Sequence, residues 1–588
     1  MKQKHTLFNR CLALVLIMVL GFTLFPMADT SAKSNKTTVS MKAKKAMLYV
    51  SSPLLPDPVA EEVTLYFNGK SDIPYLDLEF CKQNIEASLA TTNPSGLTLS
   101  SKVKGNTVTW TRTASNMTFS VKFDFKKNTI TFDDVNAFFR QEGLSLVGAE
   151  TGMRNVIDLF QPGDCNYNRY GRKYVIDLNK YGIKLLKDKK KLYIPVQTFS
   201  DIFLVPISML FLYNGENIFV LSSTAKVPDN LKEIFDKPTH KTMSKEYAAF
   251  NYGEICLALD YLYGLKETHN IKSFDSFFTE TGLGSIIKGQ EYIGTDVALS
   301  TAINLYFDDL HCGFVQKSNN TDTDRFNEQT ALIPQGSYIT RYIAAADEMN
   351  TYRKKSMPDG VLPYQEVGNT AYITFDDFTI DLTKDHTVLP TDEELPDLAN
   401  DTIRLIQYAM SKITRAGSPI KRVVLDLSNN GGGAIFTGIY LLSAFLGSSS
   451  LALQDTVTGA QSMADYKADT NLDGVFDEKD TLAGRGLDLY CFTSTVSYSC
   501  ANLVAAVFKD SGKVNLVGRT SGGGSCSITN VSTASGATIQ LSSPARFSFS
   551  KNGGFYDVDR GAEPDVFMKD MSKLYDREYM NAFLDKVS

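Results

Sequence analysis

A serine stands between a polar run and an apolar helical pattern in "STVSYSCANLVAAVFKDSGK". Ser499 directly precedes the residues with helical spacing, and Gly512 is placed to end the helix. A serine at a helix start is most often an N-cap, because its hydroxyl accepts a hydrogen bond from a free backbone amide. The alternative is a nucleophilic serine of the kind that acyl transfer uses. Cys500, next to it, is either a thiol nucleophile or a small apolar residue.

Two glycine runs follow predicted strands. In "VVLDLSNNGGG" a buried strand leads into three consecutive glycines and then a helix, and "VGRTSGGGS" repeats the pattern near residue 520. Such glycines let the backbone approach a ligand closely and adopt positive φ. The first run lacks the lysine of GxxxxGK[ST] and does not match GxGxxG. It therefore indicates either a plain tight turn or an oxyanion hole, which uses backbone donors without a lysine.

Histidines are scarce, which narrows the search for a base. Outside the first 32 residues the chain has four of them, His240, His269, His311 and His386. His311 lies in "DDLHCGF", directly after an apolar helical pattern that Gly313 is placed to end. A lone histidine there is usually structural. At a helix C-terminus beside Asp308 and Asp309, however, its protonated form should be favoured, which suits a base that holds a proton briefly.

The elements that must position these residues alternate between strands and helices. From residue 366 to residue 575 the chain reads as an α/β core, because strand-like and helix-like stretches follow one another. The stretches are, in order, "TAYITFDDF", "DLANDTIRLIQYAMSKIT", "KRVVLDL", "AIFTGIYLLSAFLG", "LDLYCFTS", the helix after Ser499 and "KVNLVG".

Two further regions precede this core, so we expect a multidomain chain. Residues 40–225 predict a β-rich (α+β) accessory module, since "NTVTWTRTASNMTFSVKFDFKKNTITF" alternates polar and apolar residues. Within it, "SDIPYLDLEF" and "KLYIPVQTFSDIF" look distantly alike, and we interpret the module as non-catalytic. After the linker-like "KVPDNLKEIFDKPTHK", residues 240–320 predict a helical cap subdomain that carries His311.

The N-terminus predicts export. Basic residues precede the apolar run "CLALVLIMVLGFTLF", and Pro26 and small residues follow it. Residues 1–32 therefore read as a secretory signal peptide, with an uncleaved anchor as the alternative. We expect a secreted or cell-envelope protein that is not an integral membrane protein after cleavage. The net charge of −6 without a basic stripe argues against a nucleic-acid partner. The eight scattered cysteines show no CxxC spacing, so neither a disulfide framework nor a zinc site is indicated.

An acidic loop, inserted at residues 469–480, has the spacing of a calcium site. "DTNLDGVFDEKD" matches the twelve-residue calcium loop, with glycine at the sixth position. The ligands would be side-chain oxygens and one carbonyl, from Asp469, Asn471, Asp473, Val475, Asp477 and Asp480. Asp480 replaces the usual bidentate glutamate, which should weaken binding. We expect a structural Ca²⁺ here, with a solvated acidic turn as the alternative.

Five segments in one order resemble the C-terminal processing peptidases and their tricorn-like relatives. They are "DDLHCG", "VVLDLSNNGGG", "STVSYSCAN", "VGRTSGGGS" and "DRGAEPDV", and the resemblance covers about residues 240–570. Each segment is weak by itself, but their shared order is specific. The resemblance implies a serine peptidase with a crotonase-like (ClpP/crotonase) catalytic core.

The resemblance also implies roles for individual residues. Ser499 matches the nucleophile, and the oxyanion donors match the backbone N–H groups of Cys500 and Gly432. Gly523 occupies the position of the lysine base of the processing branch, so a serine–lysine dyad is not available there. The tricorn-like branch uses a histidine instead, which His311 matches. The acidic residue that helps orient the site would be Asp559, with Asp557 as the alternative.

These expectations combine into one function with one rival. We expect an exported serine endopeptidase that needs no cofactor for its chemistry and cleaves protein or peptide substrates. Too few residues lie between His311 and "TAYITF" for the PDZ domain of many processing peptidases. The alternative is a catalytically silent relative that binds peptides or ligands, since a fold can be retained after its catalytic activity is lost.

Overall fold

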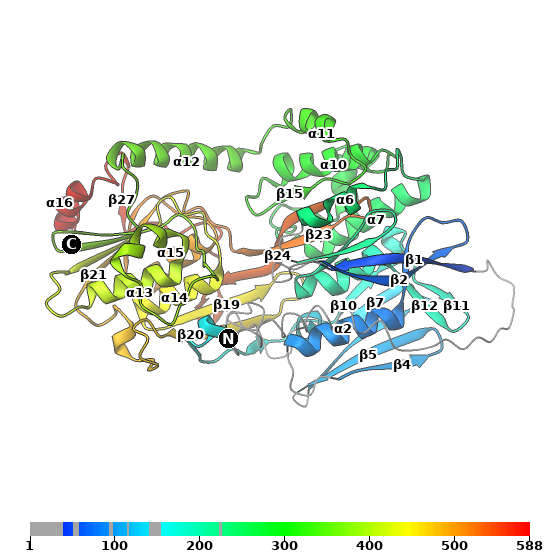
Figure 1. Cartoon of the computed structure of the whole chain (residues 1–588), viewed down its shortest axis with the longest axis horizontal. Helices are drawn as coiled ribbons and strands as arrows, with labels where there is room; N and C mark the ends of the chain where they lie inside the picture. Colours follow the sequence, from blue (N-terminus) through cyan, green and yellow to red (C-terminus); the bar gives the residue numbers. More distant parts are fainter. Residues whose placement is uncertain are drawn as a thin grey trace.

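The structure is a computed structural model that describes residues 39–50, 58–92, 98–114, 117–139, 154–222 and 226–587. The predicted signal peptide, residues 1–32, lies outside these ranges. Figure 1 shows two lobes with long strands, among them β19 and β24, running between them. The chain thus contains several sheets and helical regions, which confirms the expectation of a multidomain protein that mixes α and β structure.

The N-terminal region forms two sheets, a seven-stranded one in the order β11-β12-β3-β2-β1-β14-β13 and a five-stranded one in the order β10-β7-β6-β5-β4. The first contains β1 (Met41–Val50), β2 (Val59–Asn68), β3 (Tyr75–Asp77), β11 (Leu186–Asp188), β12 (Lys191–Pro195), β13 (Leu210–Tyr213) and β14 (Ile218–Leu221). The second contains β4 (Thr98–Lys104), β5 (Thr107–Ala114), β6 (Met117–Asp124), β7 (Thr129–Phe132) and β10 (Tyr174–Asp177). The short helices are α2 (Leu78–Thr92), α3 (Val135–Phe139), α4 (Arg154–Ile157), η2 (Leu178–Tyr181), α5 (Val196–Phe199), η3 (Ser200–Leu204) and η4 (Val205–Ile207).

The two similar stretches of this region lie side by side. β3 and β12 pair antiparallel, with Tyr75 opposite Pro195, and each strand runs directly into a helix, α2 or α5. The likeness in sequence therefore corresponds to two similar strand–helix units in one sheet.

Helices dominate the next region: α6 (Asp229–Asp236), α7 (Lys245–Leu262), α8 (Phe274–Glu280), α9 (Leu283–Ile287), α10 (Tyr292–Thr301) and η5 (Ala302–Phe307). β15 (Gly313–Gln316), α11 (Thr323–Thr330) and α12 (Ser337–Ser356) follow. We predicted that the helix before His311 would extend to it, but η5 ends at Phe307. The reason is tertiary: Asp308 adopts φ 48° and its carboxylate accepts the amides of Tyr338 and Ile339 at the start of α12.

The α/β core is a six-stranded sheet in the order β16-β17-β18-β21-β22-β27, parallel except for β16. Its strands are β16 (Tyr364–Val367), β17 (Thr370–Thr374), β18 (Arg422–Asp426), β21 (Asp488–Thr493), β22 (Asn515–Gly518) and β27 (Val566–Phe567). Its helices are η6 (Asp392–Asn400), α13 (Thr402–Ile413), α14 (Ile435–Leu446), α15 (Cys500–Ser511) and α16 (Arg577–Val587).

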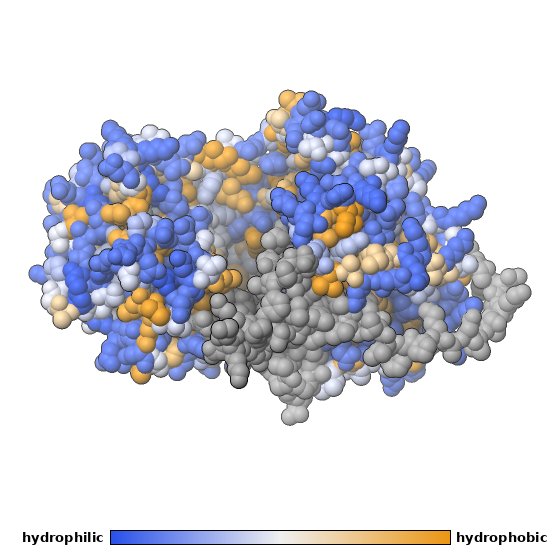
Figure 2. Space-filling model, in the orientation of Figure 1, coloured by the Kyte–Doolittle hydropathy of each residue, from blue (hydrophilic) through white to orange (hydrophobic). Residues whose placement is uncertain are grey.

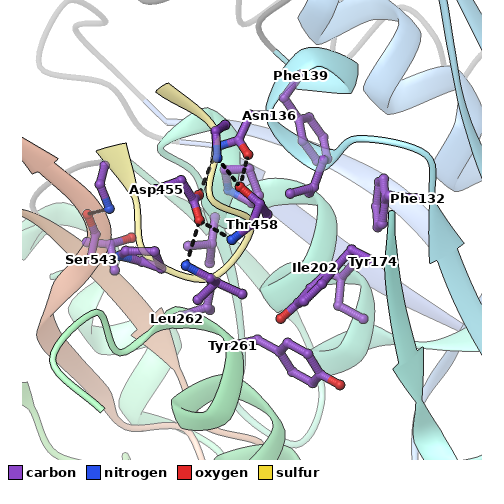
Figure 3. A pocket seen from close by; sticks show the side chains of 18 of the residues that line it. Phe132, Asn136, Phe139, Tyr174, Ile202, Tyr261, Leu262, Asp455, Thr458 and Ser543 are labelled. Atoms are coloured by element: carbon purple, nitrogen blue, oxygen red, sulfur yellow. Dashed lines mark hydrogen bonds between the residues drawn. The ribbon is translucent and has the colours of Figure 1, made fainter. Parts of the chain in front are cut away.

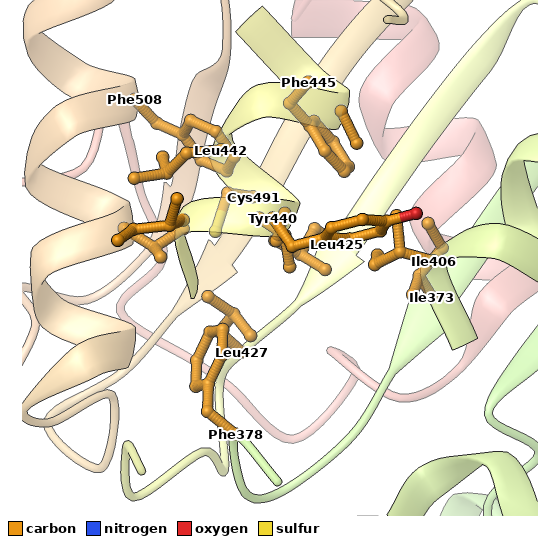
Figure 4. Close-up of a cluster of buried hydrophobic side chains, with 14 of the residues drawn as sticks. Ile373, Phe378, Ile406, Leu425, Leu427, Tyr440, Leu442, Phe445, Cys491 and Phe508 are labelled. Carbon is orange, nitrogen blue, oxygen red and sulfur yellow. The ribbon is translucent and has the colours of Figure 1, made fainter. Parts of the chain in front are cut away.

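Both faces of this sheet are covered, as buried parallel strands require. Ile373 and Leu425 pack against α13, α14 and α15, and Figure 4 shows this cluster. The neighbouring Tyr372 and Val424 point to the opposite face and pack with residues of α12 and α16. This sheet gives the site a rigid base.

A third sheet, in the order β15-β24-β19-β20-β8, connects the regions, with β23 on β24 and β9 on β20. Its strands are β8 (Phe160–Pro162), β9 (Tyr167–Arg169), β15, β19 (Ser449–Asp455), β20 (Gln461–Ala468), β23 (Cys526–Ser532) and β24 (Thr538–Ser548). The short η7 (Glu478–Asp480), β25 (Ser550–Lys551) and β26 (Gly554–Phe555) complete the chain. Because β8 and β9 come from the predicted accessory module, its boundary at residue 225 does not coincide with a sheet boundary.

The surface view shows a face on which hydrophilic residues predominate and hydrophobic ones form small separate groups (Figure 2). Among the described residues, no helix combines the length and the apolar character that a bilayer crossing requires.

Candidate active site

The site forms where three parallel strands of the core end. The carboxyl ends of β18, β21 and β22 lie at one edge of the sheet, where open α/β sheets bind their ligands. β18 leads into the first glycine run, β21 into Ser499 and β22 into the second glycine run. Backbone bonds connect them: Tyr498 N–H donates to the Asn430 carbonyl at 3.1 Å, and Ser499 N–H donates to the Gly523 carbonyl at 2.8 Å.

Ser499 does not cap its helix. It is the residue before α15, but its side chain makes no capping bond, and its backbone has φ 55° and ψ −120°. A non-glycine residue with positive φ is uncommon and strained, and such strain gathers at functional sites. Its Oγ instead lies 3.0 Å from Nε2 of His311, although 188 positions separate the two residues.

His311 is held mainly through its backbone. Its N–H donates to Oδ1 of Asp309 at 3.0 Å, and its carbonyl accepts from Nε2 of Gln540 at 2.8 Å. Gln540 lies on β24, which pairs with β15, the strand that begins two residues after His311. The imidazole ring packs on the ring of Tyr498, with centroids 4.9 Å apart. The connecting sheet thus carries the imidazole to the edge of the core.

Burial sets the charge of this imidazole. His311 is 8% exposed, and desolvation lowers its pKa below the ordinary value, against the opposing charges of Asp309 and Asp559. The expectation that the protonated form is favoured was therefore wrong, because the residue lies beyond the helix end in a buried position. A neutral imidazole can accept a proton. Its buried Nδ1 has no hydrogen-bond partner among the described residues.

Asp559 does not orient the imidazole by a hydrogen bond, contrary to the sequence expectation. Its Oδ1 accepts the Ser525 amide at 2.6 Å, and its Oδ2 accepts Nη2 of Arg546 at 2.5 Å. Asp557, the alternative, also accepts from Arg546, at 2.6 Å. Arg546 is thus the partner of both carboxylates, and Asp559 acts on His311 only through its charge.

The first glycine run lies directly against the serine. A Cβ added at Gly432, which has φ 104°, would lie 2.6 Å from the Ser499 Cβ and 3.0 Å from the Cys500 nitrogen. This close approach explains the glycine. The amide of Gly432, however, donates to Oδ1 of Asn430 at 2.9 Å, so the expected oxyanion donor is engaged in this conformation. The Cys500 amide has no acceptor within the described part of the chain.

The second glycine run packs beneath the serine. A Cβ at Gly523 would lie 2.3 Å from the Asp559 carbonyl, and one at Gly524 would lie 2.5 Å from the Tyr498 ring. Both residues have positive φ. These glycines let Tyr498 and the segment around Asp559 pack closely beside the serine, and the lysine of the processing branch would not fit here without a backbone shift.

The Cys500 thiol is not arranged as a nucleophile. Cys500 is 4% exposed, and burial raises the pKa of its thiol. Its Sγ faces Gly438, where an added Cβ would lie 2.5 Å away. Of the two interpretations of Cys500, a thiol nucleophile or a small apolar residue, the structure favours the small buried residue.

Comparison with known proteins fits this geometry. Residues 369–567 match the model of peptidase family S41. The similarity to peptidase family S41 thus lies in the α/β core of the chain. The predicted resemblance to the processing and tricorn-like peptidases is thereby confirmed, as is the prediction of a serine peptidase. No curated protein matches the chain.

Several solved structures are similar to this chain. The photosystem II D1 C-terminal processing protease is 19% identical over 34% of this chain and 42% of its own, with a TM-score of 0.24. Mature CPAF is 12% identical over 58% of this chain and 96% of its own, with a TM-score of 0.36. The tricorn protease is 11% identical over 83% of this chain and 46% of its own, with a TM-score of 0.24. The chain thus spans less than half of the D1 processing protease and of the tricorn protease.

Sequence reasoning missed several residues of the candidate site. Gln540 holds the His311 carbonyl, Tyr498 packs on the imidazole, and Arg546 holds Asp559. Tyr498 stood beside the predicted nucleophile and could have been suspected from that position. Gln540 and Arg546 lie on a strand without a local signal.

In the acidic loop, two aspartate carboxylates accept hydrogen bonds from backbone amides of the same loop. Asp469 accepts the amides of Leu472 and Gly474, and Asp480 accepts those of Thr470 and Asp477. Across the described ranges, no three His, Cys, Asp or Glu side chains converge as a metal centre. The carboxylates contact the backbone of their own loop, and no catalytic step is assigned to a calcium ion.

Calcium binding remains a prediction that titration can decide. If the loop rearranges around the ion, calorimetry should show heat on adding Ca²⁺, and Asp473→Ala should remove it, because the substitution deletes a side-chain ligand. The exposed Asp510→Ala serves as a control distant in sequence. Absence of heat, together with an unchanged unfolding temperature in Ca²⁺, would leave the loop as an acidic turn.

Proposed function

We propose that this chain is an exported serine endopeptidase in which Ser499 attacks the substrate carbonyl and His311 accepts its proton. The observation that carries the proposal is the 3.0 Å separation of Ser499 Oγ and His311 Nε2 across 188 positions. This separation is within the reach that proton transfer requires. The hydroxyl is free for this role because it does not cap α15.

The proposed reaction is acyl transfer through a covalent intermediate. As Oγ bonds to the peptide carbonyl carbon, its proton moves to Nε2 of His311, and the imidazolium then gives that proton to the leaving amine. Water, deprotonated by the same imidazole, next releases the acyl group and restores Ser499. The charges of Asp309 and Asp559 favour the transient imidazolium.

The carbonyl oxygen develops negative charge, which backbone donors would stabilise. The Cys500 amide, at the start of α15, has no competing acceptor in the described ranges. For the second donor we propose that the oxyanion replaces Asn430 Oδ1 as the acceptor of the Gly432 amide. One such donor typically contributes about 3–4 kcal/mol in the transition state.

The finer fold assignment is part of the same proposal. The parallel sheet, with turns at its carboxyl edge that lead into α14 and α15, supports a crotonase-like core. We also propose export to the cell envelope or medium, on the basis of the signal-like residues 1–32. N-terminal sequencing of the exported protein should then begin near residue 33, whereas retention of Met1 would contradict cleavage.

The proposed function can be tested with a fluorophosphonate probe followed by peptide mapping. The activated hydroxyl should displace fluoride, so the adduct should lie on Ser499, and denaturing the protein first should prevent labelling. A chain that takes up no probe while folded would support the rival, a catalytically silent relative. An adduct on another serine would also contradict the assignment.

A further inference from the structure

A cavity of about 210 Å³ lies outside the candidate active site, where the N-terminal sheets, α7 and the connecting sheet meet. Figure 3 shows large side chains from several elements converging on it. Its apolar lining includes Phe132, Phe139, Tyr174, Ile202, Tyr261 and Leu262. The volume exceeds that of an engineered cavity of about 150 Å³ that takes up benzene. A compact molecule with one or two rings would therefore fit.

The charged residues around the cavity indicate which kind of ligand it would bind. Two of its lining residues, Asp201 and Asp455, carry carboxyl groups, and none is Lys, Arg or His. Asp455 is already paired, since Oδ1 accepts the amides of Val457 and Thr458 and Oδ2 accepts Nδ2 of Asn136. Among the described residues that line the cavity, an anionic ligand would find no cation, whereas an amine would find a carboxyl group.

Asp201 supplies that group. It is 2% exposed, and its Oδ1 accepts Nε2 of Gln197 at 2.9 Å. Its Oδ2 is buried without a partner among the described residues, as is Oε2 of the equally buried Glu254. Burial raises the pKa of both carboxyl groups. A buried polar atom without a partner is rare in folded proteins, and a ligand N–H would satisfy it.

We infer that this cavity binds a compact aromatic amine, with its ring among the apolar side chains and its ammonium group on Asp201. Tyr174 and Tyr261 pack edge to face, with centroids 5.2 Å apart, and aromatic faces also attract ammonium groups. On binding, the Asp201 carboxyl group releases its proton to water, and the ammonium donates a hydrogen bond to the carboxylate that results. No covalent step is involved.

The cavity shares a strand with the candidate active site. Ser543, Pro544 and Ala545 of β24 line the cavity. On the same strand, Gln540 holds the His311 carbonyl and Arg546 holds Asp559. A ligand that shifts this wall would also shift both supports of the imidazole. We therefore assign the cavity the role of an effector site, and this role rests on the proposed function.

Binding can be measured without the chemistry, by calorimetry on the full chain carrying Ser499→Ala. The probe is 1-naphthylmethylamine, and 1-naphthylacetate is the anion with the same ring system. The amine should bind at least about tenfold more tightly than the anion, because only the amine can donate a charge-assisted hydrogen bond to Asp201. Asp201→Asn should weaken amine binding at least about tenfold. Ala258→Trp, which fills the cavity, should prevent binding, and the exposed Glu267→Gln should change nothing.

Equal binding of amine and anion, or an Asp201→Asn variant that binds as tightly as its parent, would overturn the site. The effector role has its own readout, the rate at which the chain with Ser499 intact reacts with a fluorophosphonate. Saturating amine should change that rate about fivefold, which is a typical allosteric coupling. The same amine should leave the rate of the Asp201→Asn variant unchanged. Binding without a rate change would overturn the effector role alone. A chain that never reacts with the fluorophosphonate, yet binds the amine, would overturn the proposed function. The amine-binding site would still be supported by that result.

Discussion

Ser499→Ala is expected to lower the turnover of an unfolded protein substrate such as casein by a factor on the order of 10⁴ to 10⁶. The estimate is the effect of removing a nucleophile from a serine peptidase, whose remaining activity comes from the oxyanion donors and substrate binding. The fold should persist, because the hydroxyl makes no capping bond to α15. The measurements are the rate of casein cleavage and the unfolding temperature.

Ser511→Ala is the matched control, since Ser511 lies in the last turn of the same helix and donates to the Phe508 carbonyl at 2.7 Å. It should keep its activity within about twofold, as surface changes away from special features usually do. Cleavage by Ser499→Ala within tenfold of the parent chain would show that another group performs the attack.

His311→Ala is expected to lower the same turnover by on the order of 10⁴ or more, because the hydroxyl loses its proton acceptor. Among the described histidines, His311 is the one that contacts Ser499, whereas His386 pairs with Asp401 at 2.7 Å. The exposed His240→Ala is the control and should retain activity. Nearly unchanged turnover in His311→Ala would exclude this base.

The pH profile of the parent chain provides a second readout for His311. The imidazole must be neutral to accept the proton, so kcat/KM should fall as the pH decreases through its folded pKa. Burial lowers that pKa, which places the midpoint below about 6.5, the ordinary histidine value. Asp559→Asn removes a carboxylate that raises the pKa, so its midpoint should lie lower still. A midpoint above 6.5, or a shift upward in Asp559→Asn, would contradict this assignment.

The family and the residues that meet at the site could be predicted from local patterns. Apolar spacing and Gly512 predicted the helix after Ser499, and the structure has α15 from Cys500 to Ser511, with Gly512 in the left-handed conformation. The turn after β18 needed glycine because a side chain at Gly432 would collide with Ser499. These features depend on neighbouring residues and on backbone preferences, which a short stretch of sequence records.

Which donor meets which acceptor depended on the tertiary structure. Asp308 ends η5 because it caps α12, Asn430 occupies the Gly432 amide, and Arg546 takes the Asp559 carboxylate. The charge of His311 likewise follows from its burial and not from its place after a helix. Hydrogen bonds and desolvation change over fractions of an ångström, and packing between segments far apart in the chain sets those distances. Local patterns therefore pointed to the proposed reacting groups, and folding decided their partners and their protonation.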